Sequence, residues 1–125
     1  MRSDAFRAAA EAKDFSAVDE LFTEEVTFRS PVVYKPYEGR DALLMLLSAV
    51  VQVFENFRYT GQVEHGDTAT LLFKAEVNGK ELDGIDVLRF AEDGRIRELM
   101  VMVRPMSGMH ALAEEMRARL ERVTG

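Results

Sequence analysis

The sequence predicts an α+β fold in which helices pack against an antiparallel sheet. Residues 57–104 form four β-rich runs separated by short turn sequences, which is typical of consecutive antiparallel strands. The segment from Arg40 to Phe54 is apolar on nearly all sides, so we expect a helix that other elements cover on more than one face. Polar helical segments precede and follow these elements, and they are expected to pack around the central helix.

The size of the chain and its composition predict one globular domain spanning residues 1–125. With 47% hydrophobic and 30% charged residues, the chain is too apolar to be disordered. A chain of 125 residues is long enough to bury one hydrophobic core, and the sequence contains no linker or repeat that would separate a second domain. We therefore expect the chain to fold as a single unit.

The first 39 residues predict two helices, a strand and a long loop. Ser3 or Asp4 is expected to cap a first helix that ends near Lys13, and Ser16 to cap a second helix with Phe22 turned inward. The apolar and polar residues of segment 26–30 alternate as in a half-buried strand. Prolines and a glycine frame the loop 31–39, which leads into the central helix.

Four strands and a final helix are predicted for the rest of the chain. The Asn78-Gly79 and Asp93-Gly94 pairs are strong hairpin signals, and His65-Gly66-Asp67 is a further turn. These turns divide the sequence into strands at residues 57–64, 68–77, 82–90 and 96–104. Ser107 is expected to cap a last helix, which has apolar residues at helical spacing and would cover one edge of the fold.

Charge and composition also bear on partners and location. The net charge of −6 disfavours nucleic acid, and the longest apolar run, 42–51, is about half the length that spans a bilayer. The N-terminal segment does not resemble a signal peptide and the chain has no cysteine, so we expect a cytoplasmic protein without a disulfide or thiolate site. His65 and His110 lack acidic or histidine partners at ligand spacing, and we expect neither a metal nor a cofactor.

Two stretches carry a resemblance to a known family. The run ELDGIDVLRFAEDGRI at 81–96, together with VTFRSPVVYKPYEGRDAL at 26–43, resembles the nuclear transport factor 2-like superfamily, in its ketosteroid isomerase and SnoaL-like polyketide cyclase branch. The order of predicted elements also resembles that family over nearly the whole chain. The resemblance implies a cone-shaped roll of the cystatin-like type, in which a bent antiparallel sheet wraps around helices and encloses an internal pocket open at one end.

The isomerase mechanism is only partly matched by the residues of this chain. The resemblance places Ser30 where the isomerase has a carboxylate base, and Phe6 where it has a tyrosine. Asp86 falls at the position of an aspartic acid that an apolar site keeps protonated. Because only one of three catalytic groups remains, isomerisation of a steroid by the family's route is not expected.

Asp86 is the central candidate for a ligand contact. Strand alternation places it on the same face as Leu88 and Phe90, where loss of solvation would raise the pKa of a carboxyl group. We expect Asp86 to be a neutral hydrogen-bond donor inside the pocket; the alternative is a structural hydrogen bond to a neighbouring strand or to an arginine. The other candidate ligand-binding residues are Phe28, Ser30, Tyr34, Leu71, Phe73, Leu88, Leu99, Val101 and Val103.

Among these candidates, Ser30 is expected to exchange one hydrogen bond with a ligand. No histidine or lysine at a recognisable spacing would activate it as a nucleophile. Tyr34 and Tyr37 belong to the loop that borders the pocket in relatives, where a phenol either touches ligand or packs within the loop.

These observations predict a small-molecule domain. The expected ligand is hydrophobic and steroid- or polyketide-like, and an enzymatic version would be an isomerase, cyclase or hydratase-like enzyme with Asp86 as the acid. The alternative is a non-catalytic accessory protein whose pocket is filled by its own side chains. Ile85, Val87, Met100 and Met102 should project from the outer face of the sheet, which predicts a homodimer through that face.

Overall fold

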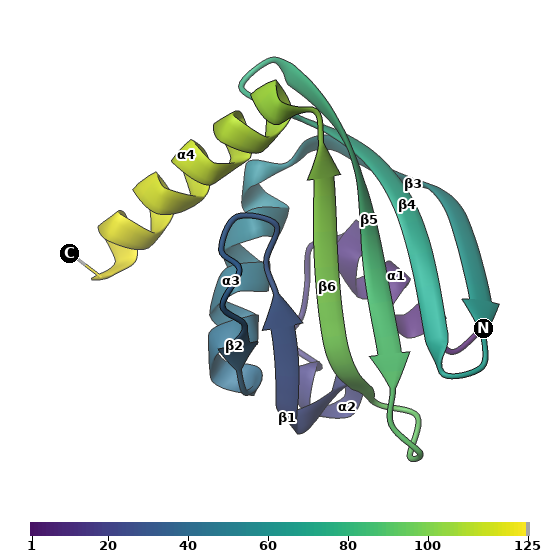
Figure 1. Cartoon of the computed structure of the whole chain (residues 1–125). Helices are drawn as coiled ribbons and strands as arrows, with labels where there is room; N and C mark the ends of the chain where they lie inside the picture. The colour runs from purple at the N-terminus through teal and green to yellow at the C-terminus, as the bar shows by residue number, and fades with distance from the viewer. Residues whose placement is uncertain (125) are drawn as a thin grey trace.

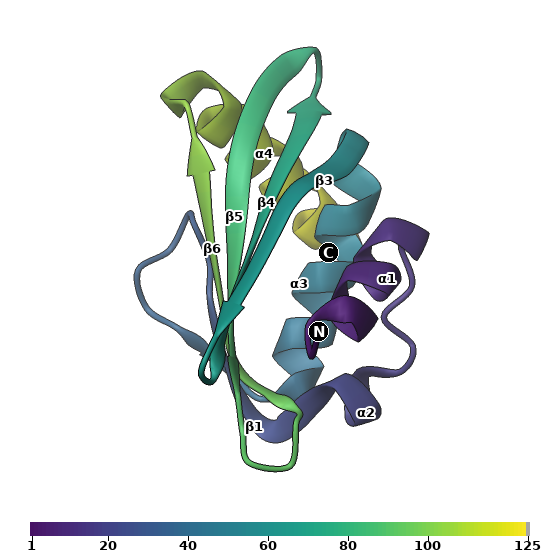
Figure 2. The same cartoon turned by 90° about the vertical axis from the view of Figure 1, so that its right-hand side faces the viewer.

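Helices lie on one side of a single curved sheet, and the sheet bends around them (Figures 1 and 2). The computed structural model describes the backbone of residues 1–124 and the side chains of residues 1–122. The helices are α1 (Asp4–Ala12), α2 (Val18–Leu21), α3 (Arg40–Val53) and α4 (Met106–Thr124). The strands are β1 (Phe22–Arg29), β2 (Tyr37–Glu38), β3 (Glu55–His65), β4 (Thr68–Val77), β5 (Lys80–Phe90) and β6 (Ile96–Arg104).

The predicted four-stranded meander is confirmed. Strands β3, β4, β5 and β6 pair antiparallel with their sequence neighbours, and the sheet order is β2-β1-β6-β5-β4-β3. Asn78 and Gly79 have φ angles of 50° and 78°, the left-handed values that a tight two-residue hairpin turn needs. This turn sets the register of the β4–β5 hairpin, in which Leu71 lies opposite Asp86.

The first strand joins the sheet in a way that the sequence did not predict. β1 pairs with β6 in parallel, with Phe28 opposite Leu99, while its other edge pairs antiparallel with the two residues of β2. The loop predicted at 31–39 therefore contains a short strand. The parallel pairing brings residues about seventy positions apart together, and no local turn signal reports such a contact.

Three predicted helix caps are wrong. α2 has only four residues and begins at Val18; Ser16 does not cap it but donates its backbone N–H to Asp14 Oδ1 over 2.9 Å. Phe22 starts β1 instead of continuing the helix. At the start of α1, Ser3 Oγ donates to Glu64 Oε2 at 2.6 Å, so this residue ties the helix to β3 instead of capping it. The last helix starts one residue before Ser107.

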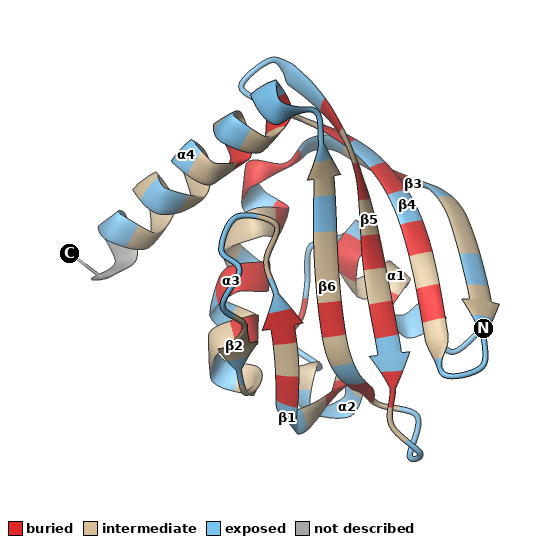
Figure 3. Cartoon of the chain, in the orientation of Figure 1, coloured by how far each residue is buried: buried red, intermediate tan, exposed pale blue. Residues whose placement is uncertain are grey.

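The hydrophobic core lies between the concave face of the sheet and α1 and α3. Buried residues alternate with half-buried or exposed ones along β4 and β5, as the colours of Figure 3 show. Helix α3 is buried on several sides, through Leu43, Leu46, Leu47, Val51 and Val53, which confirms its prediction as the central helix. Helix α4 leaves the end of β6 and extends away from the sheet, past α3 (Figure 1). Among residues 1–124, no helix is long and apolar enough to cross a membrane.

Candidate functional site

A cavity of about 350 Å³ lies between the concave face of the sheet and the helices. Its walls are aliphatic and aromatic side chains from α1, β1, α3, β3, β4, β6 and α4. Val32 and Val33 border the cavity and remain 48% and 42% exposed, so the loop after β1 forms part of its mouth. A cavity of this volume, with apolar walls and few polar groups, is typical of sites that bind small molecules.

Asp86 is the buried carboxyl group of this cavity. It lies on β5 between Leu71 of β4 and Val101 of β6, and only 6% of the residue is exposed. Its Oδ2 accepts a hydrogen bond of 2.8 Å from the hydroxyl group of Tyr59. Burial raises the pKa of Asp86 to about 7, against the opposing effect of this hydrogen bond.

Tyr59 is the partner of Asp86, and it was not among the predicted site residues. It lies on β3, lines the cavity and is 9% exposed. Burial, followed by the charge and the hydrogen bond of Asp86, raises the pKa of Tyr59 above its usual value, so the phenol keeps its proton and acts as the donor. The pair is thus a protonated phenol next to a carboxyl group that changes its charge near neutral pH.

A bulge in β3 explains why strand alternation misses Tyr59. Gln62 lies opposite Leu71 on the concave side, so strict alternation would turn Thr60 inward and Tyr59 outward. The register shifts between Gly61 and Tyr59, however, and Tyr59 lies opposite Phe73. An isolated glycine inside a strand is a known signal of such a bulge, and Gly61 was the only local sign of it.

The cavity brings together some of the predicted ligand-binding residues. Those that line it are Phe28, Ser30, Phe73, Asp86 and Val101. Ser30 Oγ accepts a hydrogen bond of 3.0 Å from the backbone N–H of Val32, so the hydroxyl group stabilises the turn after β1. Phe6, which the sequence resemblance aligned with the isomerase's tyrosine, also lines the cavity and has no polar group to offer a ligand.

Other predicted residues lie elsewhere. Tyr34 is 97% exposed at the tip of the loop, and Tyr37, opposite Phe28 in the β1–β2 pair, lines the cavity instead. Three leucines on the concave face are fully buried in the core and do not reach the cavity wall: Leu71, Leu88 and Leu99. Val103 is half-buried and also lies outside the wall. Alternation identifies the face of a strand, but not which part of that face the helices cover.

Aromatic rings surround the Tyr59–Asp86 pair. The ring of Phe57 lies 4.9 Å from that of Tyr59 and 5.0 Å from that of Phe73, measured between centroids. Phe54 adds a stacked contact with Phe57 at 5.5 Å. Flat rings of this kind provide a surface for a planar apolar ligand.

The absence of a side chain at Gly84 sets the position of Phe73 in this aromatic cluster. A Cβ atom at Gly84 would lie 2.2 Å from Cζ of Phe73, far inside van der Waals contact. We expect Gly84→Ala to push the ring into the cavity and to lower the free energy of unfolding by about 1–3 kcal/mol in urea denaturation. The matched control is Gly61→Ala, whose Cβ would meet only the flexible end of the exposed Leu72 at 3.2 Å. Equal stability of the two variants would contradict this role of Gly84.

The described side chains include no group of three or more histidine, cysteine, aspartate or glutamate residues that could hold a metal ion. At the mouth of the cavity, α4 contributes the charged side chains of Arg117 and Glu121. Inside the cavity, Asp86 and Tyr59 supply groups that can take part in hydrogen bonding and proton transfer.

The comparison with known families agrees with this geometry. A family model for the SnoaL-like domain matches residues 4–99, which is most of the chain. The chain belongs to the SnoaL-like family. The family model and similar solved structures confirm both the resemblance inferred from the sequence and the cone-shaped α+β roll. A comparison with curated proteins finds no significant match.

Solved structures place this SnoaL-like domain among similar folds. A steroid delta-isomerase from Pseudomonas aeruginosa is 41% identical, with a TM-score of 0.94 over 98% of this chain and 91% of that one. An uncharacterised protein with a cystatin-like fold from Silicibacter pomeroyi is 33% identical, with a TM-score of 0.85 over 90% and 79% of the two chains. A putative SnoaL-like polyketide cyclase from Jannaschia sp. is 11% identical, with a TM-score of 0.66 over 83% of each chain, and shares the fold alone.

Proposed function

We propose that the protein binds a flat, apolar molecule with a carbonyl oxygen, and that Asp86 donates the hydrogen bond that orients this oxygen. The observation that carries the proposal is a buried carboxyl group, held by Tyr59, in the wall of an apolar cavity of about 350 Å³. The similarity to a steroid delta-isomerase supports a steroid- or polyketide-like ligand. An open cavity of this size speaks against the alternative of an accessory protein with a filled pocket.

The site supplies the proton donor that reactions at a carbonyl group need. Asp86 can stabilise the negative charge that develops on a carbonyl oxygen when a neighbouring carbon loses a proton, which is the step that isomerases, cyclases and some hydratases share. Ser30 stands where the isomerase family has a carboxylate base, and its hydroxyl group is engaged with Val32. We therefore propose ligand binding and carbonyl polarisation as the function, with any proton abstraction left to water or to the ligand itself.

Substitution of Asp86 tests this proposal. The probe is 2-acetonaphthone, a flat aromatic ketone, and its apolar control is 2-isopropylnaphthalene; both dissociation constants are measured by calorimetry at pH 6. Asp86→Asn should bind the ketone about as well as the wild type, because its amide group donates to the ligand while its oxygen accepts from Tyr59. Asp86→Leu should lose about 1–3 kcal/mol, or about 5- to 150-fold in affinity, for the ketone alone.

The outcome that contradicts the proposal is equally clear. If Asp86→Leu binds the ketone and the apolar control as tightly as the wild type does, Asp86 does not contact the carbonyl oxygen. If neither probe binds the wild type, the cavity does not accept flat apolar molecules. Native mass spectrometry of the freshly purified protein adds an independent measurement, because a copurified ligand should have the mass of an oxygenated apolar compound.

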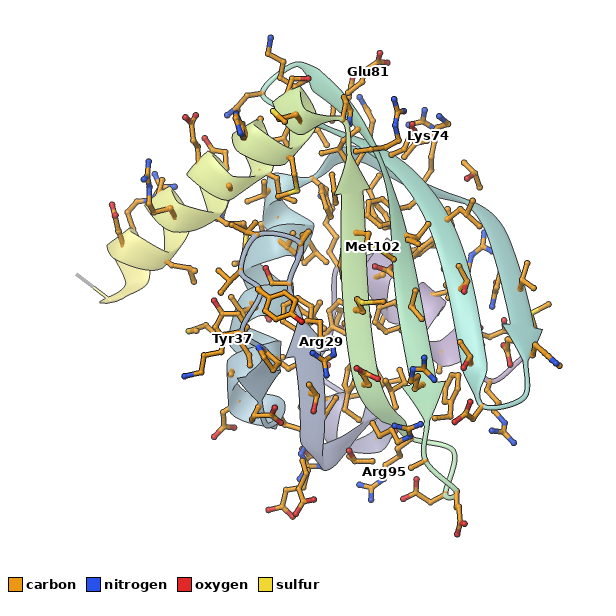
Figure 4. The ribbon with its side chains drawn as sticks, viewed as in Figure 1. Arg29, Tyr37, Lys74, Glu81, Arg95 and Met102 are labelled. Carbon is orange, nitrogen blue, oxygen red and sulfur yellow. The ribbon has the colours of Figure 1, made fainter. Side chains whose placement is uncertain are left out.

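We also propose a homodimer through the outer face of the sheet. Ile85 lies opposite Met102 and Val87 opposite Met100 on this face, and Met102 and Leu72 are 44% and 42% exposed. Figure 4 shows Met102 on the side of the sheet away from α1 and α3. Ion pairs flank this apolar stripe: Asp83 with Lys74 and Arg104 at one end, and Glu98 with Arg29 and Arg89 at the other. An apolar centre with a charged rim is typical of protein interfaces.

Light scattering at micromolar concentration measures the assembly. We expect the wild type to have the mass of a dimer, and Met102→Glu to have that of a monomer, because a buried carboxylate at the centre of the interface is costly. Met45→Glu is the matched control: Met45 is 43% exposed on α3, away from the sheet face, and the variant should remain a dimer. A wild-type monomer, or a dimer of Met102→Glu, would contradict the proposed interface.

A further inference from the structure

A cation lies over the ring of the tyrosine that holds Asp86. The guanidinium carbon of Arg7, on α1, is 5.4 Å from the centroid of the Tyr59 ring. Two partners fix the guanidinium group: its Nη1 donates to Gln62 Oε1 over 2.9 Å, and its Nε lies 3.6 Å from a carboxylate oxygen of Glu11. Arg7 is therefore held above the phenol ring and is not a free surface side chain.

The hydrogen bond from Tyr59 distinguishes the two oxygens of Asp86. The phenol donates to Oδ2, which makes Oδ2 the acceptor oxygen. In a protonated carboxyl group the carbonyl oxygen is the better acceptor and the other oxygen carries the proton. The proton that a ligand can use therefore belongs on Oδ1.

We infer that Tyr59 is a positioning residue for Asp86 and that Arg7 acts on Asp86 through the hydroxyl group of Tyr59. The inference deepens the proposed function, because it identifies Oδ1 as the donor to a ligand. A positive charge over the ring draws electron density from the phenol, which makes its O–H a stronger donor. In agreement with this, Arg7 acts to lower the pKa of Tyr59, whereas burial and Asp86 raise it.

Few charged groups surround this chain of contacts. Arg7 and Glu11 of α1 face Tyr59, while Arg117 and Glu121 of α4 lie at the mouth of the cavity. The charge of Asp86 is affected mainly by burial and then by the hydrogen bond from Tyr59. A change at Arg7 should therefore reach Asp86 chiefly through Tyr59.

The test is a carbon-13 NMR titration of the Asp86 carboxyl group in the ligand-free protein, with the signal assigned by its loss in Asp86→Asn. Tyr59→Phe removes the donor to the carboxylate and should raise the pKa of Asp86 by about one unit. Arg7→Met should raise it by about half a unit, and Arg7→Lys, which keeps the charge, by less. Arg2→Met is the matched control. The guanidinium carbon of Arg2 lies 5.9 Å from the centroid of the Phe90 ring, and phenylalanine has no hydroxyl group that could donate to Asp86. The pKa of Asp86 should therefore be the same in this variant as in the wild type.

A double variant separates the route through Tyr59 from a direct effect of charge. In the Tyr59→Phe background the ring and Arg7 remain but the hydroxyl group is gone, so Arg7→Met should no longer shift the pKa of Asp86. The inference would be overturned if Arg7→Met shifted the pKa of Asp86 equally in both backgrounds. It would also be overturned if the pKa of Asp86 were the same in Arg7→Met as in Arg2→Met. The latter result would refute the inference even if Tyr59→Phe fails to fold, since Arg7 is partly exposed and its replacement should leave the fold intact. Because no ligand is present, the result is independent of whether the cavity binds a ketone.

Discussion

Binding of a ketone in the cavity should weaken as the pH rises through about 7. Burial raises the pKa of Asp86 to about 7, so the carboxyl group is mostly protonated at pH 5.5 and almost fully ionised at pH 9. Only the protonated form can donate a hydrogen bond to a carbonyl oxygen, whereas the ionised form would repel it. The dissociation constant should therefore increase about tenfold for each unit above the pKa, which is about 100-fold at pH 9.

The measurement is a series of dissociation constants for 2-acetonaphthone between pH 5.5 and pH 9. The probe has no ionisable group, so the pH acts on the protein alone. Asp86→Asn is the control: its amide group does not titrate, and its affinity should be the same at every pH. Neither histidine lines the described cavity, and the control also removes any contribution from His65 or His110. Wild-type affinity that is independent of pH, or that rises with pH, would contradict a neutral donor at Asp86.

The parts of the fold that sequence could predict are those with local signals. The turns at Asn78-Gly79 and Asp93-Gly94 require left-handed backbone conformations, and both hairpins lie where these residues predicted them. Once the β4–β5 hairpin is placed, alternation along β5 turns Asp86 toward the concave face, where it is buried. The buried acid was therefore predictable without knowledge of the rest of the molecule.

The features that sequence did not predict depend on contacts between distant segments. The parallel pairing of β1 with β6 joins Phe28 to Leu99 without any local turn. Tyr59, the partner of Asp86, lies two strands away on β3. The bulge between Tyr59 and Gly61 turns the Tyr59 side chain to the face opposite the one that strand alternation predicts. Tyr34 was named as a candidate ligand contact, with packing within the loop as the alternative, and the β1–β2 pairing brings Tyr37 to the cavity instead.

Asp86→Asn should also make the protein more stable at pH 8. Because the pKa of Asp86 is higher in the folded chain than its ordinary value of about 3.9, folding binds a proton between pH 4 and pH 7. The contribution of Asp86 to stability is thus fully present below pH 4 and is lost as the pH rises to about 7. A difference of about three pKa units corresponds to a loss of up to about 4 kcal/mol, and asparagine avoids it because the amide stays neutral.

Urea denaturation from pH 4.5 to pH 8 tests this expectation. The free energy of unfolding of Asp86→Asn should exceed that of the wild type at pH 8, and the two should converge toward pH 4.5. The matched control is Asp83→Asn, three residues earlier on β5, where hydrogen bonds from Lys74 and then Arg104 lower the pKa of an exposed carboxyl group. That variant should lose stability at pH 8, the opposite sign, because the ionised form of Asp83 is the stabilised one. If the free energy of unfolding of the wild type does not fall relative to that of Asp86→Asn as the pH rises, Asp86 is already ionised at pH 5 in the folded protein. The neutral donor on which the proposed ligand contact depends would then be absent at physiological pH.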